Sequence, residues 1–88
     1  MHYYLLRIGS NNHVDIKTYI DSIELKNDCS KMFEYDFLSV QELDDYLGND
    51  LGDFFELFYH KIDLIEFIVN YNFIDDETKI QTLKELFN

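Results

Sequence analysis

Residues 32–60, MFEYDFLSVQELDDYLGNDLGDFFELFYH, decide the fold expected for this chain because they combine dense negative charge with three differently patterned segments. The stretch holds eight carboxylates and neither lysine nor arginine. The other 59 residues hold ten acids and seven bases, so the stretch contributes −8 to the net charge of −11 and the remainder −3. Such crowding of like charge destabilises a compact state, which a basic partner would relieve. The eight acids are Glu34, Asp36, Glu42, Asp44, Asp45, Asp50, Asp53 and Glu56.

The first segment, residues 32–38, alternates between aromatic rings and acids. Phe33, Tyr35 and Phe37 share one side, and two carboxylates share the other. A period of two predicts a strand with one acidic face. The residues before it, 26–30, contain Asn and Asp and are predicted to form a loop.

Two helices are predicted in the rest of the stretch. Ser39 and Glu42 match a capping box, in which the serine hydroxyl and the glutamate side chain each satisfy a free backbone amide. A helix is therefore expected over 40–47. Asp50 is a suitable N-cap for a second helix over 50–60, whose phenylalanines recur at helical spacing.

In that second helix the acids would form a row. Asp50, Asp53 and Glu56 are three residues apart, so they would be spaced roughly 4.5 Å along the helix axis. Continued further, the polar positions would drift around the axis, and a break near His60 and Lys61 would realign them.

Outside the stretch, residues 2–8 predict a strand that ends at the turn-forming sequence Gly-Ser-Asn-Asn. Residues 13–24 fit a helical period better than an alternating one, although a two-stranded hairpin stays open as the alternative. Two more helices are predicted over 62–72 and 76–87. We therefore expect an α+β fold, in which a two- or three-stranded antiparallel sheet is packed by helices.

Length and composition favour a single folded domain over residues 1–88. A hydrophobic content of 47%, with eight Phe and seven Tyr, is unlike the composition of disordered chains. The lone Cys29 cannot form an internal disulfide, which favours a reducing cytosol. The start of the chain lacks the features of a signal peptide, and no run approaches the about 18 apolar residues of a membrane helix. A cytoplasmic location is therefore expected.

Catalysis and metal binding have little support in the sequence. Cys29 and the three histidines share no signature of an activated nucleophile, so neither an enzyme nor a cofactor is expected. Residues 45–56 have the length of a calcium loop but lack an oxygen ligand at its third position and glycine at its sixth. Glu56, His60 and Asp63 would share a helix face, but ordinary surface residues of an acidic helix have the same spacing. No metal site is expected.

The acidity instead indicates a binding surface. It would repel nucleic acid and anionic membranes, so we expect neither as a direct ligand, and a basic protein as the partner. Arranged carboxylates imitate the phosphates of DNA, which basic nucleic-acid-binding proteins recognise. The hypothesis is a small inhibitor that blocks the nucleic-acid-binding site of such a protein by DNA mimicry, with the eight acids as contacts. In size and acidity the chain looks like phage or mobile-element proteins that block CRISPR effectors, restriction or DNA repair, although no motif is shared.

Two alternatives remain open. An immunity protein or antitoxin that neutralises a basic nuclease would use the same electrostatics. An adaptor or subunit would instead make its contacts through exposed Tyr and Phe. The sequence leaves the oligomeric state open, because a homodimer would extend the charged surface across a two-fold axis and a monomer would need no such extension.

Overall fold

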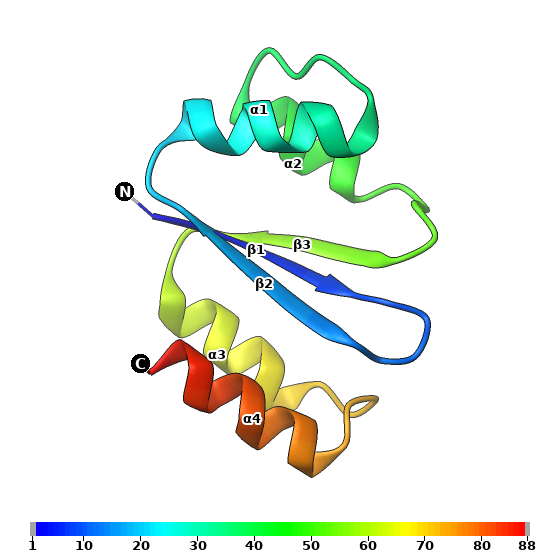
Figure 1. Cartoon of the computed structure of the whole chain (residues 1–88), viewed down its shortest axis with the longest axis vertical. Coiled ribbons are helices and arrows are strands. Elements are labelled where there is room, and N and C mark those ends of the chain that lie inside the picture. Colours follow the sequence, from blue (N-terminus) through cyan, green and yellow to red (C-terminus); the bar gives the residue numbers. More distant parts are fainter. Residues whose placement is uncertain (1, 88) are drawn as a thin grey trace.

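The protein is built in three layers, with a sheet between two pairs of helices (Figure 1). The computed structural model describes residues 2–87. The α+β class and the three-stranded antiparallel sheet packed by helices confirm the fold expected from the sequence. The elements are β1 (Tyr3–Ile8), β2 (Val14–Tyr19), α1 (Ser22–Phe33), α2 (Val40–Leu47), β3 (Phe54–Phe58), α3 (Lys61–Asn70) and α4 (Asp76–Leu86).

β1 is the central strand, and the sheet order is β2-β1-β3. Its neighbours Leu5 and Leu6 point to opposite faces because side chains alternate along a strand, and both are buried. Leu5 packs against the core beneath α1 and α2, whereas Leu6 and Ile8 pack against the core beneath α3 and α4. A strand covered on both faces needs apolar residues at successive positions, which explains the run YYLLRI.

β1 and β2 form a hairpin, which was the alternative to the helix predicted over 13–24. The amide of Gly9 donates to the carbonyl of His13 at 2.9 Å, and the amide of Asn12 donates to that of Gly9 at 3.0 Å. Asn12 has a positive φ of 56°, a conformation that asparagine tolerates better than most residues. Asn12 thus closes a turn and does not cap a helix. The helical prediction was wrong because pairing with β1 outweighs the local spacing of the isoleucines.

α1 occupies the segment predicted as a loop over 26–30 and reaches into the strand predicted over 32–38; both predictions were wrong. Asp21 caps the helix by accepting a hydrogen bond from the amide of Glu24 at 2.7 Å. Leu25 and Cys29, one turn apart, are both buried. Glu34 ends the helix in the left-handed conformation, and the residues after it form an irregular connection.

The alternating aromatic rings that suggested a strand are instead gathered by the core. Phe33 lies at the end of α1 and Phe37 in the connection, yet their ring centroids are 6.4 Å apart. Both pack in the core beneath α1 and α2, together with Tyr46 and Phe55. The alternation of rings and acids in the sequence therefore reflects the end of α1 and the connection after it, whose rings contact one another, and not a strand.

Residues 50–60 do not form the predicted helix, because β3 occupies 54–58. Phe55 and Leu57 face one core and Phe58 faces the other, so the apolar run suits a strand between two helix layers. α3 does begin after His60, its N-cap, but a strand precedes it, so the break expected within a helical segment near His60 and Lys61 is instead a change from strand to helix. The remaining helices, predicted over 40–47, 62–72 and 76–87, are confirmed as α2, α3 and α4, with ends that differ by two residues at most.

The sheet separates two cores. The upper core, beneath α1 and α2, contains Leu5, Tyr19, Leu25, Cys29, Phe37, Leu43, Leu47, Phe55 and Leu57. The lower core, beneath α3 and α4, contains Leu6, Ile8, Leu64, Ile68, Ile74 and Leu86. Among residues 2–87, no helix has the length and apolar character required to cross a bilayer.

Leu6→Ala tests the role of β1, since Leu6 is 0% exposed on the central strand. Removing a buried leucine side chain costs about 2–5 kcal/mol of unfolding free energy, through lost burial and the cavity left behind. Urea denaturation followed by circular dichroism measures this loss. Leu38→Ala, at a residue 77% exposed, serves as the control and should change stability by less than about 0.5 kcal/mol.

Candidate functional site: the acidic surface around α2

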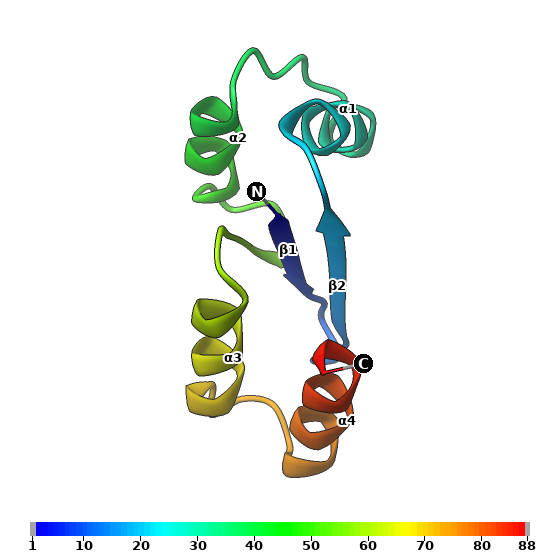
Figure 2. The same cartoon turned by 90° about the vertical axis from the view of Figure 1, so that its left-hand side faces the viewer.

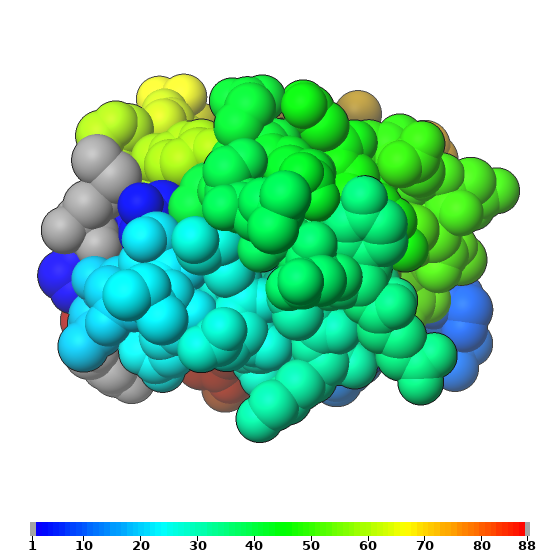
Figure 3. All heavy atoms as spheres, turned by 90° about the horizontal axis from the view of Figure 1, so that it is seen from above, coloured from blue at the N-terminus to red at the C-terminus, as the bar shows by residue number. Residues whose placement is uncertain are grey.

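The eight acids identified from the sequence lie on α2, on the connections before and after it, and on β3. Figure 3 looks down on the layer formed by α1, α2 and their connection. We call this group of eight the acidic surface. Glu34 and Asp36 precede α2, Glu42, Asp44 and Asp45 lie on it, Asp50 and Asp53 follow it, and Glu56 lies on β3. Four of them are exposed, Glu34, Asp36, Asp45 and Asp50, and the other four are half-buried.

The arrangement differs from the rows expected from the sequence. Asp50, Asp53 and Glu56 do not follow a helix, because two belong to the connection and one to a strand. Glu34 and Asp36 likewise lie outside any strand. The acidic surface is therefore drawn from several separate segments, in place of straight rows.

α2 carries the central acids of the acidic surface and is fixed by a cap and by core contacts. The Ser39 hydroxyl accepts a hydrogen bond from the amide of Glu42 at 3.1 Å, so the serine cap predicted from the sequence is confirmed. Leu43 and Leu47 are buried in the upper core on one side of the helix. The opposite side carries Asp45, which accepts a hydrogen bond from the Gln41 side chain at 3.0 Å.

Asp44 and Glu56 affect each other through charge, although one lies on α2 and the other on β3. The Tyr59 hydroxyl donates to a carboxylate oxygen of Asp44 at 3.2 Å. Burial raises the pKa of Glu56, and the nearby charge of Asp44 raises it further. Burial also raises the pKa of Tyr59, with the same carboxylate adding to the effect. Glu56 is thus an acid whose charged form is disfavoured first by burial and second by the charge of Asp44. Its neighbours Phe55 and Leu57 face α2, so strand alternation points Glu56 toward the other face of the sheet.

Asp53 has a different role from the other acids. Its carboxylate binds Arg7 of β1, with oxygen to guanidinium distances of 2.6 and 2.7 Å. The guanidinium also lies 5.7 Å from the ring centroid of Phe55. This ion pair ties the start of β3 to β1 and neutralises Asp53. The sequence offered no signal for it, because the partners are 46 residues apart.

Within residues 2–87, no lysine forms an ion pair with the acidic surface. Lys61 donates to the carbonyl of Leu86 at 2.8 Å, and Lys79 donates to that of Val69 at 3.0 Å. Both therefore satisfy carbonyls at helix C-terminal ends, where positive charge is favourable. Within residues 2–87 the ion pairs are Arg7 with Asp53 and Lys17 with Asp28. Seven of the eight acids consequently have no ion-pair partner in this part of the chain.

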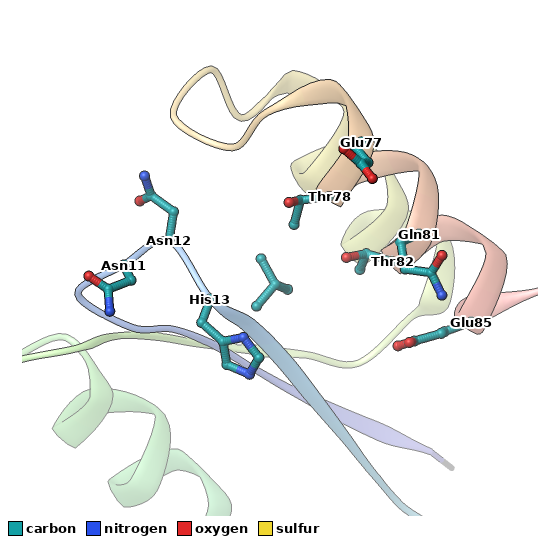
Figure 4. A pocket seen from close by; sticks show the side chains of 9 residues that line it. Asn11, Asn12, His13, Glu77, Thr78, Gln81, Thr82 and Glu85 are labelled. Atoms are coloured by element: carbon teal, nitrogen blue, oxygen red, sulfur yellow. The ribbon is translucent and has the colours of Figure 1, made fainter.

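One hollow lies at the acidic surface, and a second lies away from it. One of about 360 Å³ includes Asp50, Asp53 and Glu56 in its lining, and the Asp50 carboxylate accepts a hydrogen bond from the amide of Gly52 at 3.2 Å beside it. A larger one of about 650 Å³ lies between the hairpin turn and α4 (Figure 4). Amide, hydroxyl and carboxylate groups form most of its lining, and none of the eight acids is among them. No pattern in the sequence had pointed to this hollow.

The groups weighed for catalysis and metal binding are placed apart. Cys29 is buried in the upper core, and burial raises the pKa of its thiol to about 11, so the thiol stays protonated at neutral pH. Glu56 is on a strand, His60 caps α3 and Asp63 is in its first turn, so they share no helix face. In the described range, 2–87, no three potential ligands gather around a common point.

Comparison with known proteins gives no match: no protein-family model fits the chain, and neither curated proteins nor solved structures show significant similarity to it.

Glu56→Gln tests the cost of the charge on Glu56, which burial disfavours most and the charge of Asp44 disfavours further. Because the folded-state pKa of Glu56 lies above its ordinary value of 4.5, the native state binds the proton more tightly than the unfolded state. Native stability therefore falls as the pH rises through this window and stays reduced above it. The variant should be more stable than wild type at neutral pH, by less than about 1 kcal/mol because solvent screens this half-exposed group.

Urea denaturation across a pH series measures the effect. The difference between variant and wild type should fade as the pH falls below 4.5, where the glutamate is protonated in both states. Glu34→Gln, at an exposed glutamate, is the control and should show no such convergence. A Glu56→Gln protein that is less stable than wild type at neutral pH would contradict this cost of the charge on Glu56.

Proposed function

We propose that this protein is a small acidic inhibitor that blocks the nucleic-acid-binding site of a basic protein by DNA mimicry, through the acidic surface around α2. The observation that supports the proposal is the set of seven carboxylates that have no ion-pair partner within residues 2–87. A surface evolved only for solubility usually intersperses both signs of charge, whereas residues 32–60 contain no base.

The geometry suits recognition by a cationic groove. Duplex DNA offers one negative charge per about 1.7 Å of its axis, which basic proteins bind through Lys and Arg. Glu42 and Asp45 are one turn apart on a capped helix, and Asp50 continues the charge past the end of that helix. Carboxylates held on a fixed scaffold lose little conformational freedom when a partner binds. Association would be electrostatically steered and strongly salt-dependent.

The eight acids do not contribute equally in this proposal. Asp53 is already paired with Arg7, and Glu56 is half-buried on β3, across from Leu6 of β1. We therefore assign the main contacts to the exposed acids and to α2: Glu34, Asp36, Glu42, Asp44, Asp45 and Asp50. The protein would act without catalysis or cofactor.

The target is a protein such as a CRISPR effector, a restriction enzyme or a DNA repair enzyme, all of which hold DNA in basic grooves. A phage or mobile-element origin and a host-cell cytosol would suit such targets, and the unpaired, buried Cys29 suits a reducing compartment. An immunity protein or antitoxin would use the same surface against a basic nuclease. A toxin gene beside this gene would favour that alternative.

The triple variant Asp44→Asn, Asp45→Asn and Asp50→Asn tests the acidic surface. Removing three charges should weaken capture of the basic partner at least about tenfold, because long-range attraction and direct contacts are both lost. Immobilised wild-type and variant proteins are incubated with host-cell lysate, and the bound proteins are identified by mass spectrometry. The wild type should retain a nucleic-acid-binding protein that competing duplex DNA releases.

The matched control is Asp63→Asn, Asp76→Asn and Glu77→Gln, which removes the same charge from exposed positions in α3 and α4. This control should capture the partner nearly as well as wild type. If both triple variants capture it equally, or if capture survives high salt, the acidic surface around α2 is not the contact. Capture that depends on exposed aromatic rings would then favour the adaptor alternative.

A further inference from the structure

The outer face of α3 and α4 is apolar, although the chain as a whole is strongly acidic. Five large hydrophobic residues on these helices and their connection are between 50% and 74% exposed. They are Ile62, Val69, Phe73, Ile80 and Phe87. Concentrations of exposed apolar residues on small proteins mark interaction surfaces far more often than single exposed side chains do.

The two helices lie side by side on the sheet face opposite α1 and α2 (Figure 2). Lys61 at the start of α3 reaches the carbonyl of Leu86 at the end of α4, and Lys79 near the start of α4 reaches that of Val69. The helices are therefore antiparallel, with Phe87 near the start of α3 and Ile80 near its end. The exposed apolar residues of both helices therefore lie in one band that runs parallel to the helix axes, which we call the seam.

Both helices present the same pattern along this seam. On α3 it is Ile62, Glu66 and Val69, and on α4 it is Ile80, Lys84 and Phe87. Each set has the i, i+4, i+7 spacing of one helix face. Leu83 lies between the α4 residues and, with them, lines a hollow of about 420 Å³. We call these residues, with Phe73, the outer helix face.

The charges on this face are self-complementary. Among the residues that define it, Glu66 is the one acid and Lys84 the one base, both exposed, whereas the chain carries −11. Asp76 and Glu77, exposed in the first turn of α4, border this face beside Ile80. Neither Glu66 nor Lys84 is in an ion pair within residues 2–87. If a two-fold axis runs along the seam, α3 of one copy faces α4 of the other, and each Glu66 meets the second copy's Lys84. A two-fold axis across the seam would instead place like charges together, which is unfavourable.

We propose that the outer helix face is the interface between two copies of this chain. The two helix pairs pack face to face, with α3 of each copy on α4 of the other. The residues that define this face carry no net charge, so two acidic chains would repel each other less there than through the acidic surface around α2. The dimer leaves both acidic surfaces free, because α2 lies on the other side of the sheet (Figure 1). The proposal does not depend on the inhibitor function.

Charge reversal tests the pairing across the interface. Wild-type protein should sediment as a dimer at micromolar concentrations. Glu66→Lys and Lys84→Glu should each raise the dimer dissociation constant at least about tenfold, because each places like charges opposite one another. The double reversal restores opposite charges and should recover a dissociation constant close to that of wild type. Circular dichroism confirms that every variant is folded.

The apolar part of the face is tested by Ile80→Asp, which should give a monomer. Leu38→Asp places the same change at an exposed residue in the α1–α2 connection and should leave the dimer intact. A wild-type protein that is monomeric even at high micromolar concentration overturns the proposal, and so does a dimer that Ile80→Asp does not affect. A folded double reversal that stays monomeric overturns the packing of α3 on α4.

Discussion

The requirement that β1 be covered on both faces shapes the whole molecule. Leu5 and Leu6 are adjacent, point in opposite directions and are both almost fully buried. One helix layer cannot shield both of them, so the chain places α1 and α2 above the sheet and α3 and α4 below it. In a domain of this size the two thin cores share one strand, and their combined burial must offset the entropy of ordering the chain. The connections that carry α2 and its acids follow from this layered arrangement.

The few basic residues are used in ways that leave the acids exposed to a partner. Arg7 fixes the start of β3 through Asp53, and two lysines bind carbonyls at the ends of α3 and α4. None of these contacts neutralises α2. Concentrated negative charge disfavours the compact state, so the hydrophobic burial in the two cores must outweigh this repulsion. At Glu56, burial raises the pKa most and the charge of Asp44 adds to the rise, so charge repulsion is the smaller part of this local cost.

The two helix layers have different surface chemistry. Carboxylates concentrate around α2, whereas apolar side chains line the outer seam of α3 and α4. A protein that binds a basic partner with one layer and a second copy of itself with the other would present two acidic surfaces on opposite sides of a dimer. Such an arrangement would increase the apparent affinity for any target with two basic sites, provided that both can be reached together.

The sequence by itself determined the elements whose signals are local. Ser39 begins α2 and Asp75 begins α4, because a cap requires only residues within one turn. The strand β1 was also evident, since its apolar run ends at clear turn residues. The acidity of residues 32–60 was evident from composition alone, and so was the expectation of a binding surface.

Tertiary structure decided the rest, because short apolar segments fit both helical and strand periods. Residues 14–19 and 54–58 became strands only through pairing with β1, and the rings of Phe33 and Phe37 share a core without sharing a strand. The pairing of Asp53 with Arg7 and the effect of the Asp44 charge on Glu56 likewise depend on how separate elements pack. Local sequence sets where charge is concentrated, whereas the folded chain determines which charges are neutralised and which remain available to a partner.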